Sequence, residues 1–517
     1  MTPSFNLLDE KWIPCVKAGG QSQVLNLKDV FVFARDFADL AGDSPLVTTA
    51  LYRFLLAILH RVYQGPSSHA AWNEIWSARK FDVEKITGYL ETWRERFYLF
   101  HDTHPFYQSE TAKGQLKPIS KLLQVHGNAS GNNALLFDHH PDDFSEADLP
   151  TCARALIAAQ SFGFAGLSGI KGKEEKFTDA SCTRGALFLA QGNNLFETLV
   201  LNLIRYDGEL PIRQRREDRP CWEMEDPFAV RTFPNGYVDY LTWQSRRIKL
   251  ILANPASSNL ARVREMRMSQ VLPIHTSLMQ GDPMKRYRKD EERGWLVLRF
   301  NESRALWRDS VALFTLKEEG KNKPPAVMSW LAQLTFSRGY LERSQTLQYL
   351  ALGMASEPGQ DKIYFHRAER MPLPLAYLGD DNALNTLRNA LQVAEQVGDV
   401  RESALSRAGY RIAIEQLLPK RKPDHRLSDN EKTGVQNLKS DLALERRYWA
   451  QMELAFVYTF ERIPSNPSDA LQEWKTQIKS TAQNVFDQAT RGLGTSARTL
   501  RAVSLARQQL QEELKRV

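Results

Sequence analysis

The sequence predicts an α+β fold, with a large mixed amino-terminal domain over residues 1–375 followed by an all-α four-helix bundle over residues 376–517. The first 35 residues contain short apolar runs typical of strands, whereas the carboxy-terminal part places apolar residues three, four or seven positions apart. The 517 residues are 42% hydrophobic and 25% charged, which is typical of globular proteins and excludes wholesale disorder.

In the amino-terminal domain, short strands are expected over 6–16 and 23–33, because Pro14 limits strand length and Gly19-Gly20 favours a turn. Polar sequence over 108–148 indicates a long functional or disordered loop. The remaining patterns predict helices over 45–63, 83–99, 152–161, 183–206 and 325–352, and strands over 236–253 and 294–300.

Four amphipathic helices are predicted in the carboxy-terminal domain, because each stripe has apolar residues at helical spacing and the connections contain Pro or Gly. A bend is expected near Gly398. The four stripes run from Leu384 to Ala394, Leu438 to Phe460, Leu471 to Ala489 and Leu500 to Leu514.

The positive charge is concentrated in one segment. The chain has 68 Lys or Arg and 61 Asp or Glu, a net charge of +7. Residues 240–289 hold ten of these cations against Glu265 and Asp282, so this segment is +8 and the rest is −1. Such an excess indicates an anionic partner at one place on the surface, and the near absence of pairing acids favours a nucleic-acid backbone over a solvated face.

Other function classes lack their sequence signals. No run approaches 18 apolar residues and the amino terminus lacks a signal-peptide pattern, so no membrane span is expected and the protein is expected in the cytoplasm. The four cysteines lie far apart without a Cys-x-x-Cys pair, which favours reduced, buried thiols.

No cofactor or metal is predicted. The chain has no Gly-x-x-x-x-Gly-Lys-Ser/Thr phosphate loop, and the glycine-rich stretch 163–169 lacks the Lys-Ser/Thr ending. Its small residues favour close approach of backbone to a ligand, with a flexible connector as the alternative. His101 and His104 supply at most two metal ligands, so a structural role is favoured for both.

A series of short motifs resembles one known family. In order, they are NLLDEKWIP (6–14), FYLFHDTHPFYQ (97–108), PISKLL (118–123), GFAG (163–166), TLVLNLI (198–204) and GYVDYLTWQ (236–244). Together with the carboxy-terminal helices they resemble CasA, the large subunit of the type I-E CRISPR surveillance complex Cascade, over almost the whole chain.

The resemblance implies a non-enzymatic subunit that recognises the protospacer-adjacent motif in double-stranded DNA, starts strand separation and R-loop formation, and helps recruit the helicase-nuclease. The implied partners are CRISPR RNA, the small subunit, the backbone subunits and the subunit that binds the 5′ handle of the RNA. The guide RNA would read the remaining target sequence by base pairing.

The resemblance also implies site residues. The family's glycine loop matches Gly163, Phe164, Ala165 and Gly166, with Ala165 interrupting the glycine run. Its basic residue facing the motif falls among Arg262, Arg264 and Arg267, with Arg267 the first choice. Its strand-separating hairpin matches Gly359, Gln360, Asp361 and Lys362, with Gln360 as the wedge.

Two further segments are predicted to meet RNA or DNA. The resemblance implies that Asn132, Asn133, Leu136 and Phe137 belong to a loop that docks near the guide RNA and neighbouring subunits. Charge patterning predicts a basic DNA path over Lys285, Arg286, Arg288 and Lys289. Family members with paired cysteines could bind zinc after the docking loop, but here only Cys152 is nearby.

Two alternatives from other classes stay open at this point. One is a metal-dependent nuclease that uses His101, His104 and the acidic residues of 138–143. The other is a structural scaffold that binds partner subunits without recognising DNA.

Overall fold

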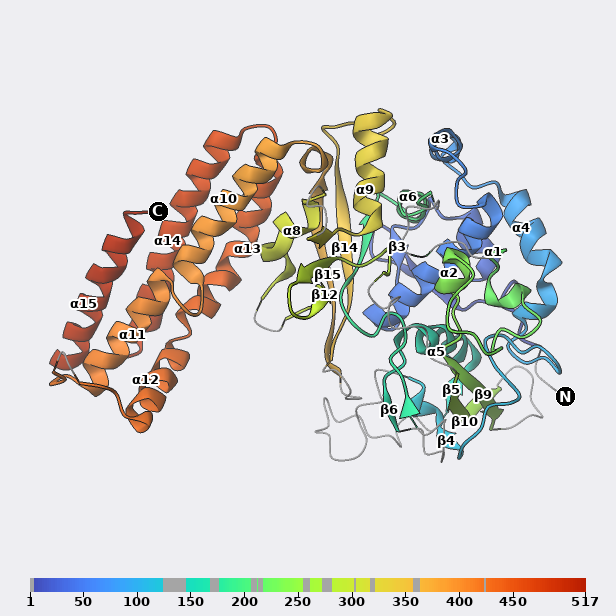
Figure 1. Cartoon of the computed structure of the whole chain (residues 1–517), viewed down its shortest axis with the longest axis horizontal. Helices are drawn as coiled ribbons and strands as arrows, with labels where there is room; N and C mark the ends of the chain where they lie inside the picture. Colours follow the sequence, from blue (N-terminus) through green and yellow to red (C-terminus); the bar gives the residue numbers. More distant parts are fainter. Residues whose placement is uncertain are drawn as a thin grey trace. The chain divides into compact units, whose positions relative to one another are not determined.

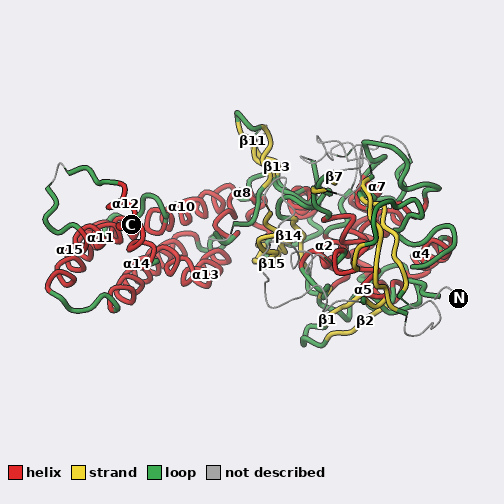
Figure 2. Tube along the Cα trace, turned by 90° about the horizontal axis from the view of Figure 1, so that it is seen from below, coloured by secondary structure: helices red, strands yellow, loops and turns green. Residues whose placement is uncertain are grey.

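A computed structural model describes residues 4–123, 146–167, 176–205, 212, 217–253, 261–271, 281–301, 304–316, 321–356, 363–422 and 425–517. The predicted α+β fold is confirmed: helices and small antiparallel sheets make up the amino-terminal part, and the carboxy-terminal part is helical (Figures 1 and 2). The chain forms two compact units, Met1–Leu306 with Thr315–Leu378 and Trp307–Phe314 with Gly379–Val517.

The first unit contains several small antiparallel sheets. One sheet has the strand order β2 (Ser22–Leu25), β1 (Ile13–Val16), β3 (Asp39–Leu40), and a second has the order β15 (Ile363–Pro374), β14 (Thr346–Ser356), β8 (Leu187–Gln191). A third has the order β12 (Gly294–Val297), β11 (Tyr287–Asp290), β13 (Asn322–Lys323). The two strands β6 (Gly166–Leu167) and β7 (Lys176–Phe177) form a fourth. In a further sheet, β10 (Arg262–Gln270) pairs with β9 (Arg246–Leu252), β4 (Lys117–Pro118) and β5 (Ala147–Asp148).

Helix α2 (Pro45–Tyr63) forms the centre of the first unit. The Ser44 side chain caps it by accepting the Val47 N–H at 3.3 Å, as the sequence predicted. The helix is long and apolar enough to cross a membrane, but 83% of that window is buried inside the protein, which identifies it as a core helix. The other helices are α1 (Leu27–Val32), α3 (His69–Ala78), α4 (Val83–Thr92), α5 (Leu149–Phe162), α6 (Leu195–Leu201), α7 (Tyr237–Leu241) and α9 (Ala326–Ala332).

Four sequence predictions in this unit were partly wrong. The predicted strand 23–33 contains the last three residues of β2, but α1 then follows, with its N-terminus capped by Asn26. The predicted helix 183–206 contains β8 followed by α6, with Asn194 capping α6. The predicted helix 325–352 contains α9 and then the start of β14, and the predicted strand 236–253 begins with α7. Every residue of β8 is buried, so its apolar run has no alternation that distinguishes a strand from a helix.

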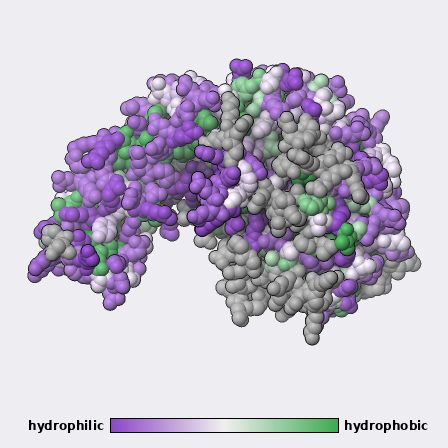
Figure 3. Space-filling view, viewed as in Figure 1, coloured by the Kyte–Doolittle hydropathy of each residue, from purple (hydrophilic) through white to green (hydrophobic). Residues whose placement is uncertain are grey.

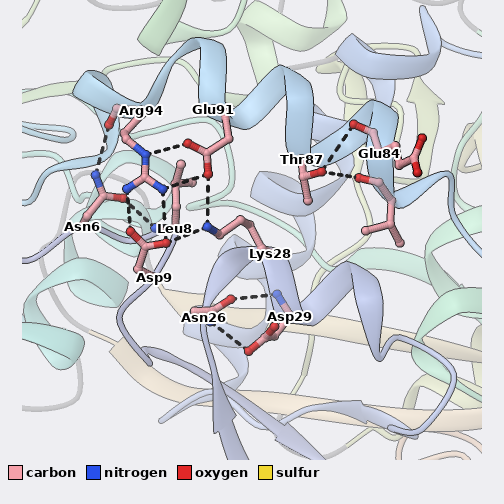
Figure 4. A network of polar contacts seen from close by, with 11 residues as sticks. Asn6, Leu8, Asp9, Asn26, Lys28, Asp29, Glu84, Thr87, Glu91 and Arg94 are labelled. Carbon is pink, nitrogen blue, oxygen red and sulfur yellow. Dashed lines mark hydrogen bonds and ion pairs between the residues drawn. The ribbon is translucent and has the colours of Figure 1, made fainter.

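The amino-terminal motif 6–14 is held by a network of polar contacts (Figure 4). The Asp9 carboxylate accepts hydrogen bonds from Arg94 at 2.5 Å and Lys28 at 2.6 Å, and both cations also contact Glu91. The hydrogen bond from Arg94 lowers the pKa of Asp9 to about 2. These contacts tie the first residues of the chain to α1 and α4.

The second unit contains α8 (Ser310–Phe314), α10 (Asp381–Gly398), α11 (Ala404–Leu417), α12 (Asp429–Leu442), α13 (Leu444–Arg462), α14 (Pro467–Arg491) and α15 (Ala497–Leu514). Helix α11 was not among the four predicted stripes, and the second stripe is divided between α12 and α13. Ser403 caps α11 after the chain bends beyond Gly398, and Ala443, at φ +48°, separates α12 from α13.

The second unit also includes segment 307–314. The predicted division of the chain at residues 375/376 left this segment in the amino-terminal domain. The Arg308 guanidinium stacks 3.6 Å from the Trp449 ring and forms an ion pair with Glu395 at 2.7 Å. Trp307 stacks on Phe456 with ring centroids 4.3 Å apart.

Replacing Gly398 by Ala is expected to destabilise the second unit. A Cβ at this position would lie 2.4 Å from Tyr448 Cδ1, and overpacking of this kind costs about 1–3 kcal/mol. Gly434→Ala is the matched control, because its nearest neighbour would lie at an ordinary 3.6 Å and loss of a helical glycine stabilises by about 0.5–1 kcal/mol. Scanning calorimetry of the two variants checks the prediction, and equal melting temperatures would contradict it.

Candidate nucleic-acid interface

The structure describes three of the segments predicted to contact nucleic acid: residues 163–166, which we call the glycine turn, strand β10 and residues 285–289. The predicted wedge segment (Gly359, Gln360, Asp361, Lys362) and docking loop (Asn132, Asn133, Leu136, Phe137) lie outside the described residues. The strands that flank the wedge segment in sequence, β14 and β15, are paired antiparallel from Thr346↔Pro374 to Ser356↔Ile363.

Strands β9 and β10 present an outward basic face. Val263 and Met266 are buried, whereas Arg267 lies directly opposite Lys249 and Arg264 is exposed at an irregularity between Val263 and Glu265. Like charges opposite each other on two strands are unfavourable unless anions lie nearby. Here Glu110 pairs with Lys249, and the Arg267 guanidinium donates to the Gly114 carbonyl at 2.5 Å. The arrangement leaves Arg264 and Arg267 on a surface that a phosphate can approach.

The structure corrects the predicted basic DNA path. Lys285 is 2% exposed and Arg286 is 9% exposed, so neither side chain lies at the surface. Lys285 Nζ donates to the Ser181 carbonyl at 2.6 Å, and burial lowers its pKa. Arg288 and Lys289, which lie on β11, are exposed. Of the four residues of the predicted path, therefore, only Arg288 and Lys289 are exposed.

Arg246 is a further buried cation of the basic segment, and it organises the glycine turn. Its side chain is 1% exposed, and burial lowers its pKa to about 10, so it stays protonated at neutral pH. Its Nη2 donates to the carbonyls of Phe164 at 2.9 Å and Thr178 at 2.6 Å. Its Nη1 donates to Gln270 Oε1 at 3.1 Å. One guanidinium thus holds both ends of the segment 164–178 and the end of β10.

Other polar groups complete the base of this turn. Asp179 accepts the Ala165 N–H at 2.9 Å, and Gln270 Oε1 accepts the Thr178 N–H at 3.0 Å. The short strands β6 and β7 then pair Gly166 with Phe177. The backbone on both sides of the turn is therefore fixed by side chains from β9, β10 and the residues after β7.

Gly163 ends α5 where the Arg246 guanidinium packs closely. A Cβ on Gly163 would lie 2.9 Å from the Ala159 carbonyl oxygen and 3.1 Å from two guanidinium nitrogens. The Gly163 carbonyl also accepts the Ala180 N–H at 2.8 Å and the Thr183 hydroxyl at 3.0 Å. The first glycine of the predicted loop is thus required by packing within the protein.

His101 and His104 contact the same residue, Thr103. The Thr103 hydroxyl lies 3.2 Å from His101 Nδ1 and 2.8 Å from His104 Nδ1, and Glu95 lies 3.4 Å from His101 Nε2. Burial, followed by the positive charge of Arg96, lowers the pKa of His104. Within the described residues, no group of three His, Cys, Asp or Glu side chains could hold a metal ion. The acidic residues 138–143, which the nuclease alternative requires, lie outside the described residues.

Comparisons with known proteins identify the family. The model of "CRISPR-associated protein Cse1" matches residues 6–485. The chain belongs to the Cse1 family. A "CRISPR-associated protein CasA/Cse1" from Thermus thermophilus is 33% identical over 98% of this chain and 96% of its own length. The resemblance inferred from the sequence motifs is therefore confirmed.

Solved Cse1 structures share the fold of this Cse1-family chain. The crystal structure of Thermus thermophilus CasA matches with a TM-score of 0.79 and 29% identity over 99% of this chain and 100% of its own. Acidimicrobium ferrooxidans Cse1 matches with a TM-score of 0.81 and 22% identity, covering 99% and 98% of the two chains. A chain of a structure titled "CRISPR RNA-guided surveillance complex" matches with a TM-score of 0.73 and 20% identity, covering 98% and 99%.

The sequence did not identify Arg246, Gln270 and Asp179 as residues that hold the glycine turn of this Cse1-family chain. Arg246 stands next to Arg247 in the sequence, and their neighbours give no signal that one is buried and the other is not. Pairing of β9 with β10 decides this, because it turns Arg246 inward at the end of the sheet.

Arg246→Met should loosen the glycine turn while keeping side-chain length. The Phe164 and Thr178 carbonyls would lose their donors, and an unpaired buried polar group costs about 1–3 kcal/mol, which corresponds to roughly ten- to hundredfold faster local opening. Hydrogen exchange of the Ala165 and Thr178 amides, measured by mass spectrometry, reports this opening. Gly163→Ala should act in the same direction, and Gly88→Ala, which meets nothing within 4 Å, is its control. Unchanged exchange in Arg246→Met would contradict the role of Arg246.

Proposed function

We propose that this Cse1-family chain is the large subunit of a type I-E CRISPR surveillance complex, and that it recognises the protospacer-adjacent motif in double-stranded DNA and starts strand separation. One observation supports this most. The two segments that the family resemblance assigns to motif recognition, 163–166 and 262–267, are joined through Arg246 and Gln270 although they lie about a hundred residues apart in the sequence. A shared base allows both to face one duplex at the same time.

In the proposed mechanism, each segment makes a different kind of contact. Arg264 and Arg267 bind phosphates on the outward basic face, which gives affinity without sequence preference. The glycine turn lets backbone approach the minor groove, where the donor and acceptor pattern is degenerate, so several motifs would be tolerated. Neither step uses a catalytic residue, in keeping with a non-enzymatic role.

The proposed partners are CRISPR RNA, the small subunit, the backbone subunits, the subunit at the 5′ handle and the helicase-nuclease. Full-length structural matches to chains titled as parts of RNA-guided surveillance complexes support assembly with other subunits. The docking loop Asn132–Phe137 and the wedge Gln360 keep their predicted roles as parts of this proposal. We also propose a cytoplasmic location.

The proposed function is tested by binding the assembled complex to a library of duplexes with randomised flanking motifs. Enrichment of a limited set of motifs, lost when this subunit is omitted, is the expected result. Equal binding to all motifs, with or without this subunit, would leave only the scaffold function.

The double variant Arg264→Gln/Arg267→Gln should weaken binding of the complex to DNA and reduce its salt dependence. Each lost phosphate contact lowers the slope of log K against log salt by about 0.9. The control is Arg35→Gln/Lys80→Gln, which removes the same charge from exposed positions outside the outward basic face. Equal slopes for the two variants, measured by electrophoretic mobility shift at several salt concentrations, would reject a phosphate contact at Arg264 and Arg267.

Gln360→Ala should leave general DNA affinity largely intact and slow R-loop initiation on linear duplex. Unstacking one base pair costs roughly a few kcal/mol, and contacts from a polar wedge offset this cost. Loss of the wedge should therefore reduce opening of the duplex next to the motif. Permanganate reactivity of thymines in the first pairs measures that opening. If reactivity equals that of the wild type, the wedge assignment is wrong.

A further inference from the structure

Six exposed cations gather at one end of the second unit. Lys420, Arg421, Lys422 and Arg426 follow α11, and Arg498 and Arg501 lie on the first turns of α15. We call these six residues the basic end. Within the described residues, none of the six forms an ion pair with a carboxylate, so their charges are directed to solvent.

Packing brings the two parts of the basic end together. Helices α11 and α15 lie side by side (Figures 1 and 2), and Gln416 Nε2 donates to Thr499 Oγ1 at 3.1 Å. Gln416 stands four residues before Lys420, and Thr499 lies between Arg498 and Arg501. The cations from two segments about 75 residues apart in the sequence therefore share one surface.

The loop that carries four of the cations is anchored on both sides. Leu418 and Leu427 pack against a buried cluster formed by Ala413, Ile414 and Val435 of α11 and α12. The Arg421 N–H donates to the Leu418 carbonyl at 3.1 Å, and the His425 N–H donates to the Lys422 carbonyl at 3.1 Å. These contacts anchor the described residues of the loop to α11 and α12.

Three acidic residues near the basic end are engaged elsewhere, whereas Asp424, between Lys422 and Arg426 in the sequence, lies outside the described residues. Glu431 contacts His425 at 3.1 Å, Asp429 contacts Lys432 at 2.9 Å, and Asp487 contacts Arg507 at 2.8 Å. Over 379–517 the sequence has 21 Lys or Arg and 18 Asp or Glu, a net charge of +3. Removing the six cations of the basic end leaves 15 against 18, or −3. The charge of this unit is thus strongly uneven.

We propose that the basic end binds the phosphate backbone of nucleic acid without sequence preference. Its six cations are on long, exposed side chains and come from two neighbouring segments, so several of them can reach phosphates of one strand or duplex. Interfaces between proteins are enriched in aromatic residues and depleted in Lys, whereas the basic end contains two Lys and no aromatic residue. The visible face of the second unit is mainly hydrophilic (Figure 3), although two leucines beside the basic end, Leu417 and Leu500, are 46% and 57% exposed.

This proposal goes beyond the proposed function, which assigns DNA contact to the first unit. It adds a second phosphate-binding surface that does not depend on motif recognition. A chain that failed to select motifs could still bind phosphates at the basic end, so the two proposals fail separately.

The test uses the full chain and a 30-base-pair duplex without any selected motif, with binding measured by fluorescence anisotropy over a range of salt concentrations. The variant Lys420→Gln/Arg421→Gln/Lys422→Gln/Arg426→Gln should raise Kd at least about tenfold at low salt and lower the log–log salt slope by roughly 2 to 4. Adding Arg498→Gln/Arg501→Gln should lower the slope further. The matched control is Arg388→Gln/Arg401→Gln/Arg446→Gln/Arg447→Gln, which removes four exposed cations from the same unit outside the basic end.

A slope that falls for the test variant and stays near the wild-type value for the control supports the proposal. Equal slopes for the two variants would overturn it, because the effect would then follow net charge alone. An unchanged DNA slope together with weaker incorporation into the assembled complex would also overturn it, since the basic end would then bind an acidic protein surface. Melting temperatures of all variants confirm that a loss does not come from unfolding.

Discussion

The buried guanidinium of Arg246 is the interaction on which the candidate interface depends. Removing a charge from water is costly unless hydrogen bonds replace the lost solvation. Here four acceptors surround it: the carbonyls of Phe164, Thr178 and Ser245, and the Gln270 amide oxygen. The Phe177 ring lies 4.8 Å from the guanidinium carbon. This set of partners explains how the side chain remains charged although it is buried.

The same contacts explain why the glycine turn needs a neighbouring sheet. A segment of small residues has little apolar surface to bury, so its own packing does little to fix its conformation. Arg246 supplies fixed donors from β9, and Gln270 supplies an acceptor from β10. The position of the turn is therefore set by the sheet whose other residues, Arg264 and Arg267, face outward. In the proposed function, this shared support would couple binding of the turn and binding of the strand to one duplex.

The sequence predicted the α+β class, the helical carboxy-terminal part and the Ser44 cap from local patterns, because these features follow from residue periodicity and capping chemistry. It failed at β8, where burial of every residue removes the alternation that marks a strand. It also failed at the start of β14, although exposed and buried residues alternate from Thr346 to Tyr349. It also treated Arg246, Lys285 and Arg286 as surface charges. Only tertiary pairing decides whether a cation faces solvent, and no local pattern contains that information.

The net charge of a segment in the sequence differs from the charge that the segment presents at the surface, because some of its cations are buried. Lys285, Arg246 and Arg286 contribute to the +8 segment but hold the interior of the protein together, so the surface charge near β10 is smaller than the sequence suggests. The second unit shows the opposite case. Its sequence is almost balanced, yet the fold gathers six exposed cations where α11 and α15 meet. Counterion release depends on charges that reach the phosphates, and not on the total in the chain. A protein of this kind can therefore have two separate regions of phosphate affinity while its overall charge stays modest.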